Sequence, residues 1–211
     1  SNKKIPTHAW MKEEDRWSLA VKAYLACVRW VDEQIGRVLD TLDESPYAKN
    51  TIIILYTDHG YHLGEKQRWS KFSLWERTTR VPFIVRMPGQ AKGKSTRPVE
   101  LLSIYPTLID LCGLASNKSI EGVSIAPLLR DPNAHWEHVA ISTLGRNNHS
   151  IRDERWRYIR YADGAEELYD HDSDPNEWNN LAATDLSPLR AKVVARLKQH
   201  LPKVNLPQRT K

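Results

Sequence analysis

The chain has 211 residues, of which 40% are hydrophobic and 27% charged, and its formal net charge is +5. This length and apolar content suffice for one large domain, or for a domain with a small appendage, and they argue against extended disorder. The basic residues are spread along the chain without a stripe of interleaved aromatic residues, so a solvated surface is favoured over nucleic-acid binding. No run approaches the roughly 18 consecutive apolar residues of a membrane span.

The first half of the chain has the pattern of alternating helices and strands. Apolar residues recur at three- and four-residue spacing over 13–43, which predicts one long helix that ends at Ser45-Pro46. An unbroken apolar run at 52–56 then predicts a strand. A strand that is apolar on both faces is typical of a parallel sheet covered on both sides, so the pair indicates half of a βαβ unit.

A long polar loop is expected next, followed by short elements. The loop covers 57–80, with a helical turn near 73–78, and a second short strand covers 81–86. A helix is expected over 103–112, with Ser103 as its cap and Gly113 as its stop, and another short helix over 124–130.

After Pro132 the pattern changes to short β-rich runs separated by turn residues, which predicts a small antiparallel sheet. An amphipathic helix over 187–201 follows, and 202–211 is expected to be a loose tail. We therefore expect a larger α/β part over 1–130 and a small α+β subdomain over 131–211. The expected strands are 138–143, 149–152, 155–161 and 167–169, and the expected buried face of the helix is Leu189, Val193, Val194 and Leu197.

Two cysteines, Cys27 and Cys112, have no metal-type spacing. One lies in a helical pattern and the other near a helix end, so buried free thiols are favoured over a disulfide.

Candidate chemistry lies where the 52–56 strand ends. Ligands of open α/β sheets bind beyond the carboxyl ends of the strands, and Asp58 and His59 stand there, followed by Gly60. A carboxylate and an imidazole are suitable metal ligands. The alternative is that Asp58 caps a turn while His59 makes a polar contact, and for a bare Asp-His-Gly this alternative is favoured.

The loop that follows favours a functional site, because so long a polar loop is costly to order without a role. His62, Glu65, Lys66, Arg68 and Lys71 all lie in it. Lys71 has aromatic neighbours on both sides, and aromatic packing can desolvate a lysine charge, which suits an anion such as sulfate or phosphate.

The sequence does not complete a metal site. A hard cation takes about six oxygen ligands, and Asp170, Asp172 and Asp174 lie in a late, turn-rich segment where we expect them at the surface. Further ligands must then come from water, another segment or another chain.

A series of short motifs runs through nearly the whole chain. They are Tyr24, Val31-Asp32, Ile35-Gly36-Arg37, Thr57-Asp58-His59-Gly60, Leu63-Gly64-Glu65, Trp69-Ser70-Lys71, Thr79-Arg80-Val81-Pro82, Pro88-Gly89, Ser103-Ile104-Tyr105-Pro106-Thr107, Arg157-Tyr158-Ile159, Glu167-Leu168-Tyr169-Asp170, Asp174-Pro175, Glu177 and Asn180-Leu181. In their order and spacing these motifs resemble the sulfatase family of the alkaline-phosphatase-like superfamily. The resemblance is closest to the branch with iduronate-2-sulfatase and choline-sulfatase-like enzymes.

The resemblance implies a fold and a set of roles. The fold would be α/β: a portion of the alkaline-phosphatase-like sheet plus a small C-terminal α+β subdomain with a short antiparallel sheet. Asp58 and His59 would help to bind a divalent cation, usually calcium, although an imidazole is a poor calcium ligand. Lys71 would contact the sulfate, and His62 would line the pocket, with or without touching the substrate. Asp32, Glu65, Arg80 and Pro82 are assigned to packing and loop order.

One departure from the family concerns the nucleophile. Sulfatases use a formylglycine made from Cys or Ser in a Cys-x-Pro/Ala/Ser-x-Arg motif, and neither Cys27 nor Cys112 starts one. We interpret the chain as the carboxyl-terminal portion of a sulfatase, with the formylglycine expected upstream, and we expect this portion alone to be inactive.

The expected function of the whole protein is hydrolysis of sulfate esters, with sulfated sugars, polysaccharides or another sulfated small molecule as substrates. A phosphonate or phosphodiester hydrolase of the same superfamily and a non-catalytic binding module are the alternatives. The resemblance also suggests a secreted, periplasmic or lysosomal protein. Because a partial sheet exposes a strand edge and an apolar face, we expect self-association or association with the missing half.

Overall fold

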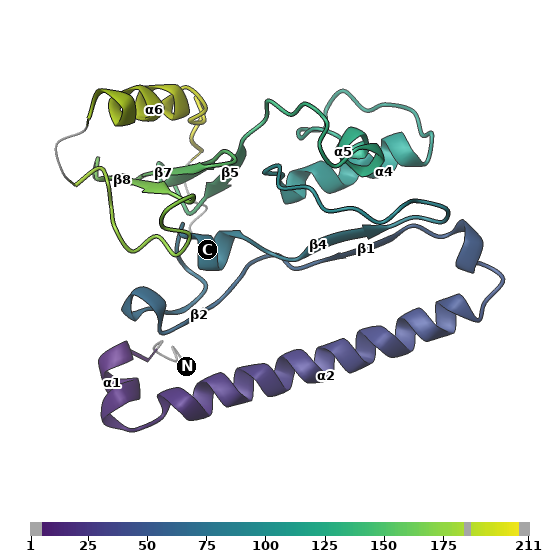
Figure 1. The fold of residues 1–211 in the computed structure, drawn as a ribbon, viewed down its shortest axis with the longest axis horizontal. Helices are drawn as coiled ribbons and strands as arrows, with labels where there is room; N and C mark the ends of the chain where they lie inside the picture. Colours follow the sequence, from purple (N-terminus) through teal and green to yellow (C-terminus); the bar gives the residue numbers. More distant parts are fainter. Residues whose placement is uncertain (1–5, 184–186, 207–211) are drawn as a thin grey trace. The chain divides into compact units, whose positions relative to one another are not determined.

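The computed structural model describes residues 6–183 and 187–206 (Figure 1). Contacts within the chain define two compact units, each described here on its own. Unit 1 consists of the described part of 1–71 together with 80–90, and unit 2 of 72–79 together with the described part of 91–211. The division of the chain near residue 130 stays a prediction.

The elements of unit 1 are α1 (His8–Glu13), α2 (Trp17–Asp43), the 3₁₀ turn η1 (Ala48–Asn50), β1 (Ile53–Tyr56), β2 (His62–Leu63), the 3₁₀ turn η2 (Glu65–Gln67), β3 (Trp69–Ser70) and β4 (Phe83–Arg86). Unit 2 contains α3 (Glu76–Thr79), the 3₁₀ turn η3 (Leu101–Ser103), α4 (Ile104–Leu111), α5 (Ala126–Arg130), β5 (Ala140–Thr143), β6 (His149–Arg152), β7 (Trp156–Arg160), β8 (Glu166–Asp170) and α6 (Pro188–Lys198).

The long helix predicted over 13–43 is present as α2, but its start was wrong. The chain breaks between α1 and α2, where Asp15 has a positive φ of 49°. A helix cannot continue through a left-handed residue, so the apolar periodicity resumes only at Trp17. The separate α1 is capped by Thr7, whose hydroxyl accepts a hydrogen bond from the Trp10 N–H at 3.2 Å.

The strand predicted at 52–56 forms as β1, but its pairing differs from the expected parallel one. β1 pairs antiparallel with β4, from Ile53 opposite Arg86 to Tyr56 opposite Phe83. The side chains of β1 are also only partly buried or exposed, rather than buried on both faces. β4 begins after Pro82, which lacks the N–H that a strand pair requires. Arg86 Nη2 donates to Asp43 Oδ1 at 2.6 Å, which ties β4 to the end of α2.

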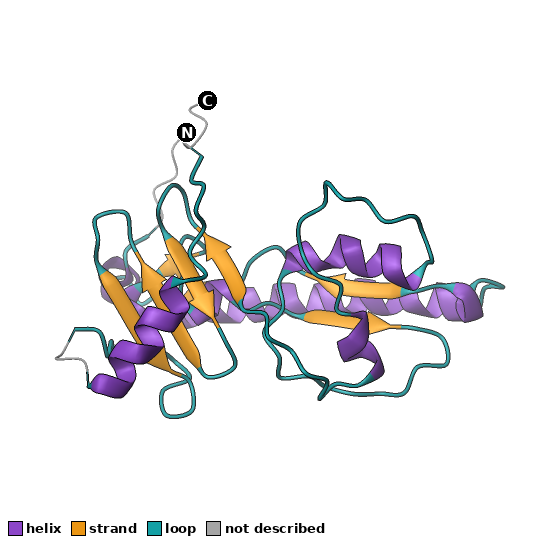
Figure 2. Ribbon diagram, turned by 90° about the horizontal axis from the view of Figure 1, so that it is seen from above, coloured by secondary structure: helices purple, strands orange, loops and turns teal. Residues whose placement is uncertain are grey.

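Unit 2 contains the antiparallel sheet that the sequence predicted. The strand order is β5-β6-β7-β8, and every neighbouring pair is antiparallel. Figure 2 shows α6 lying across one face of this sheet. Val193, Val194 and Leu197 of α6 join the buried cluster of the sheet, whereas Leu189 is 64% exposed, so its predicted burial was wrong. Leu189 lies in the first turn of the helix, just after Pro188.

Four other sequence predictions for unit 2 have mixed outcomes. The helix predicted over 103–112 forms as η3 and α4, but Ser103 makes no side-chain cap; Gly113 ends the helix with φ +62°, as expected. Asp170 was expected at the surface but is buried, because Arg155 Nε and Nη2 donate to its carboxylate at 2.8 and 2.7 Å. That pairing holds the Asp170 pKa below its usual range.

The cysteines are free, as predicted, but both Cys27 and Cys112 are exposed rather than buried. Cys27 lies on α2, which has no buried residue along its length. Its exposure therefore follows from the exposure of the helix as a whole.

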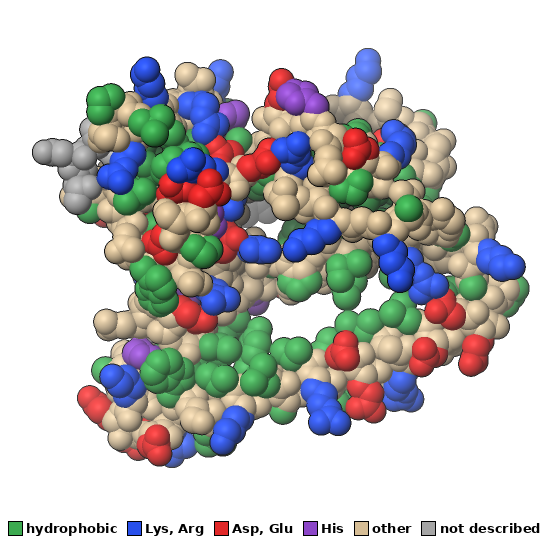
Figure 3. Space-filling model, in the orientation of Figure 1, with side chains coloured by type: hydrophobic (Ala, Val, Ile, Leu, Met, Phe, Trp, Pro, Cys, Tyr) green, Lys and Arg blue, Asp and Glu red, His purple; other side chains and the backbone are tan. Residues whose placement is uncertain are grey.

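An exposed apolar face runs along α2. Figure 3 shows hydrophobic side chains gathered along α2 on the side that faces β1 and β4 of the same unit. Tyr24, Val28, Val31 and Val38 follow one another at spacings of four, three and seven residues, which places them on one side of α2, and each is more than a third exposed. Despite this face, none of the helices in 6–183 and 187–206 has the length and apolar content that crossing a membrane requires.

Candidate functional site

Asp58 and His59 lie directly beyond the carboxyl end of β1 and are in contact with each other. His59 Nε2 lies 3.6 Å from Asp58 Oδ1. The Asp58 side chain is 79% exposed and that of His59 is 33% exposed. The Thr57 hydroxyl makes a long hydrogen bond to Asp58 Oδ1, at 3.5 Å, and its Oγ1 lies 3.4 Å from the His59 carbonyl oxygen. The end of β1 therefore presents a carboxylate and an imidazole together at the surface.

A backbone hydrogen bond fixes the tautomer of His59. His59 Nδ1 lies 2.9 Å from the Gly60 carbonyl oxygen. Because a carbonyl oxygen only accepts, Nδ1 carries a proton, so in the neutral ring Nε2 is the nitrogen with the lone pair, and it lies on the side of Asp58. Histidine ligands of metals usually donate their other ring N–H to a carbonyl in this way.

The two side chains fit a shared cation. One metal ion touches nitrogen and oxygen ligands at about 2.0–2.6 Å, so atoms that are 3.6 Å apart can both contact a single ion. The exposure of the carboxylate leaves room for further ligands. A single carboxylate and an imidazole do not complete a coordination shell, so water or other oxygen ligands are required.

A short hairpin of β2 and β3 follows. His62 is its first residue, and Lys71 comes directly after its last one. His62 is in β2, 1% exposed, and its Cα pairs with that of Ser70 in β3. Lys71 comes directly after β3 and is exposed, so the predicted desolvation of its charge by aromatic neighbours is not found. Phe72 is itself 59% exposed. All four predicted site residues thus belong to unit 1.

The hairpin loop is held in part by His8 and Trp17, which sequence reasoning did not single out. Trp17 Nε1 donates to the Leu63 carbonyl at 2.7 Å, and Trp69 Nε1 donates to His8 Nδ1 at 3.3 Å. The rings of His8 and Trp17 contact edge to face, with centroids 4.6 Å apart. Within the loop, Glu65 Oε2 accepts a hydrogen bond from the Leu63 N–H at 2.7 Å, in agreement with its expected role in loop order.

The backbone of this loop is strained. Lys66, Gln67 and Ser70 have φ values of 52°, 58° and 75°, in the left-handed region that residues other than glycine rarely adopt. Gly64 has a φ of 115°, and a Cβ built on it would lie 2.9 Å from the His8 ring. Strained residues cluster at functional sites because the surrounding structure has to impose them. The strain therefore points to the segment just before Lys71.

Unit 2 contains a second group of possible metal ligands, which the sequence did not reveal. Glu76, His171 and Glu177 offer ligand atoms that all lie within 4.8 Å of one another. However, the Arg157 guanidinium forms ion pairs with both Glu76 and Glu177, and Arg152 Nε lies 3.8 Å from Glu76 Oε2. Two arginines already balance two carboxylates, so the group fits a buried ion-pair network better than a cation site.

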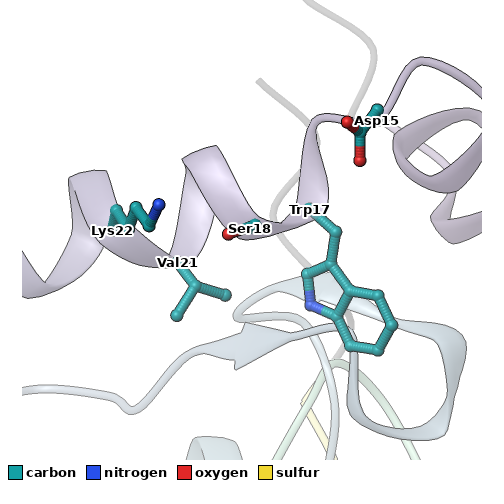
Figure 4. Close-up of a pocket in the computed structure, with 5 residues that line it drawn as sticks. All are labelled: Asp15, Trp17, Ser18, Val21 and Lys22. Carbon is teal, nitrogen blue, oxygen red and sulfur yellow. The ribbon is translucent and has the colours of Figure 1, made fainter.

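Two pockets have linings that include none of Asp58, His59, His62 and Lys71. An open pocket of about 510 Å³ lies at the start of α2, where Figure 4 shows Trp17 and Val21 extending from the helix on one side. A second pocket of about 220 Å³ lies in unit 2 and is lined in part by Glu100 and His138. Burial raises the pKa of the Glu100 carboxyl, against the hydrogen bond that it accepts from the Ile141 N–H at 2.7 Å.

Two family models match the chain. The model described as "Sulfatase" matches residues 4–114, and the model described as "N-sulphoglucosamine sulphohydrolase, C-terminal" matches residues 64–206.

Curated relatives match most of the chain. It is 46% identical over 202 residues to a protein named sulfatase from Formosa agariphila, covering 95% of this chain and 39% of that protein. A choline-sulfatase from Rhizobium meliloti is 32% identical, with 80% and 34% covered. A Delta 4,5-hexuronate-2-O-sulfatase from Bacteroides thetaiotaomicron is 33% identical, with 88% and 40% covered. The chain thus spans about two fifths or less of the length of these relatives.

Solved structures agree on the fold. A 2-O GAG sulfatase matches with a TM-score of 0.76 at 28% identity, covering 92% of this chain and 45% of that one. A structure in complex with its substrate D-glucosamine-2-N,6-O-disulfate matches with a TM-score of 0.74 at 29% identity, covering 88% and 40%. A phosphonate monoester hydrolase from Silicibacter pomeroyi matches with a TM-score of 0.69 at 26% identity, covering 81% and 38%.

Proposed function

Because the chain belongs to the sulfatase family, we propose that the complete protein hydrolyses sulfate esters and that this chain supplies part of its active site. Asp58 and His59 would hold a divalent cation, Lys71 would bind the sulfate group, and His62 would line the pocket. The nucleophile, a formylglycine, would come from a segment outside these residues. By itself, this chain is expected to be inactive.

The observation that carries the proposal is the geometry at the end of β1. Asp58 Oδ1 and His59 Nε2 are 3.6 Å apart, and the His59 Nδ1–H donates to the Gly60 carbonyl, so the nitrogen facing Asp58 is the one able to bind a metal. When bound, the cation would offset negative charge on the sulfate oxygens. Resemblance to the family favours calcium, whereas the imidazole favours a softer ion, so the identity of the ion is part of the test.

Lys71 would act as a cationic hydrogen-bond donor. Its side chain is exposed and lies directly after the strained hairpin. An ammonium group at this place can donate to sulfate oxygens and stabilise the charge that develops as the ester bond breaks.

Sulfated sugars are the proposed substrate class. One relative is named for action on a hexuronate 2-O-sulfate, and one similar structure contains a disulfated glucosamine as its substrate. The net charge of +5 is compatible with anionic saccharides. A secreted, periplasmic or lysosomal location follows from the family resemblance alone and stays a prediction.

Phosphonate monoester hydrolysis is the second candidate. Its support is the match to the Silicibacter pomeroyi enzyme, whose TM-score of 0.69 shows that the same fold serves a different ester. A cation beside a lysine would bind a phosphonate as well as a sulfate, because both present negatively charged oxygens.

The test is a direct comparison of substrates and variants in the complete protein. We expect turnover of an aryl sulfate to exceed that of a phenyl phosphonate monoester, and Lys71→Ala to lower kcat/KM for the sulfate by about 100-fold or more. Arg68→Ala, another exposed cation of the same loop, is the matched control and should have little effect. Faster hydrolysis of the phosphonate would replace the sulfatase proposal with the second candidate.

The cation site can be tested on the 211-residue chain itself by calorimetric titration with calcium, magnesium, manganese and zinc ions. Asp58→Asn and His59→Ala should each weaken binding of the preferred ion, whereas His135→Ala, an exposed histidine of unit 2, should not. Equal binding by all four proteins would remove Asp58 and His59 from the site.

A further inference from the structure

The segment Phe72–Thr79, called here the anchor segment, belongs to unit 2, although the residues on both sides of it belong to unit 1. Its Leu74 is only 2% exposed and packs in one cluster with residues of β7 and β8. Trp75 Nε1 donates to Glu167 of β8 at 2.6 Å. Apolar packing and a charge-assisted hydrogen bond thus both fix this segment on the sheet of unit 2.

Two buried side chains also hold the backbone of the anchor segment. Arg157 of β7, 3% exposed, donates Nη1 to the Leu74 carbonyl at 3.4 Å and Nη2 to the Glu76 carboxylate. Glu177, 1% exposed, accepts a hydrogen bond from the Glu76 N–H at 2.8 Å. Arg157 Nε and Glu177 Oε1 form an ion pair at 2.5 Å. The same pair of charges therefore contacts successive peptide groups of the segment.

His171 completes the network from the turn after β8. Its Nε2–H donates to Glu177 Oε1 at 2.9 Å, and its Nδ1 lies 4.0 Å from Glu76 Oε1. Moving the segment away would take the Glu76 carboxylate from Arg157 and the Glu76 N–H from Glu177, and a lost hydrogen bond to a buried charge is costly at low dielectric.

Lys71 lies three residues before Leu74. A chain covers at most about 3.6 Å per residue, so the fixed Leu74 keeps the Lys71 Cα within about 11 Å. A displacement of about 1 Å in a group that contacts the reacting centre can cost about 100-fold in rate. The position of the anchor segment therefore limits where the Lys71 ammonium group can lie.

We propose that Arg157 and Glu177 are positioning residues for Lys71, acting through the backbone of the anchor segment. The inference rests on the proposed sulfate-binding role of Lys71. It assigns a function to a buried network of paired charges. This network belongs to unit 2 and does not include Asp58 or His59.

The anchoring itself is tested by hydrogen exchange on the 211-residue chain. Glu177→Gln keeps the size of the side chain but removes its charge, and it should raise exchange at amides of the anchor segment at least about tenfold. β6 and β7 should keep their protection. Glu166→Gln, which removes the partner of Lys198 at the start of β8, is the matched control and should leave the segment unchanged. Unchanged exchange in Glu177→Gln would overturn the anchoring.

If Glu177→Gln also unfolds the sheet, Arg157→Lys provides a second test. It retains the positive charge but loses the forked geometry that contacts both Leu74 and Glu76. Local loss of protection over the anchor segment supports the proposal, and full protection in this variant overturns it.

The positioning role is tested in the complete enzyme by a double-mutant cycle. Glu177→Gln should lower kcat/KM for an aryl sulfate at least about tenfold in the parent enzyme and should cost nothing further in Lys71→Ala. Additive losses would mean that Glu177 does not act through Lys71. Unchanged activity in Lys71→Ala alone would overturn both the role of Lys71 and its positioning, whereas the exchange result would still stand.

Discussion

At the residue scale, Gly64 shows how closely the hairpin loop packs on the first helices. Its φ of 115° and the His8 ring 2.9 Å from a built Cβ both oppose a side chain. Gly64→Ala should therefore lower the free energy of unfolding by about 1–3 kcal/mol, measured by urea denaturation. Gly36→Ala is the control: this glycine lies inside α2 with nothing within 4 Å of a built Cβ. It should gain about 0.5–1 kcal/mol from helix propensity.

Also at the residue scale, Glu177 makes stability depend on pH. Burial alone would raise its pKa, but the hydrogen bond from His171 and the charge of Arg157 outweigh burial and hold the pKa below its ordinary value of 4.5. A carboxyl with a lowered folded-state pKa contributes stability that is fully present above the unfolded value. That stability is lost as the pH falls through the folded pKa.

We expect the free energy of unfolding to decrease as the pH drops below 4.5. This decrease should be smaller in Glu177→Gln, because the variant has no carboxylate at this position to protonate. Denaturation midpoints of the two proteins, compared from neutral pH to below pH 4.5, measure it. The gap between parent and variant should narrow with acid. A constant gap would mean that the Glu177 charge is not stabilised by its partners.

At the scale of elements, α6 illustrates which apolar residues form the core. Leu197 is fully buried against the sheet, whereas Leu189 of the same helix is 64% exposed. Leu197→Ala should cost about 2–5 kcal/mol of unfolding free energy, because a cavity remains where the side chain was. Leu189→Ala should change it by less than about 0.5 kcal/mol. Equal effects in thermal unfolding would contradict the packing described for α6.

Elements with a clear local pattern could be predicted from the sequence. The four short strands after Pro132 and the helix α6 follow from alternation and from the 3.6-residue period, and they are confirmed. Leu189 was misplaced because periodicity does not show where a helix leaves the sheet. The antiparallel pairing of β1 with β4 was missed because an apolar run does not identify its partner strand.

The candidate site could be predicted only where its residues are close in sequence. Asp58 and His59 are neighbours, and the structure brings their side chains to 3.6 Å. The network joins Glu76 to Arg157, 81 positions later, and to Glu177, 101 positions later, so spacing gave no signal for it. His8 and Trp17 were missed for the same reason, since they contact the loop only through the fold.

At the scale of the whole molecule, the exposed apolar face of α2 predicts association. Val28 is 50% exposed within this face, and burying such a side chain contributes about 1.5 kcal/mol or more. We expect the 211-residue chain to bind an apolar dye and to self-associate, and Val28→Lys to weaken association about tenfold in sedimentation experiments. Glu33→Gln changes the net charge equally and is the control. A monodisperse parent monomer that binds no dye would contradict this prediction.

The polypeptide passes from one unit to the other three times: after Lys71, after Thr79 and after Gln90. No single cut in the coding sequence can therefore release either unit whole, and a protease nick at one crossing leaves two covalent links intact. During synthesis, the strand pair β1–β4 and the hairpin β2–β3 are complete long before β7 and β8 emerge. Phe72–Thr79 must therefore wait for its partners while the sequence on both sides of it can already fold.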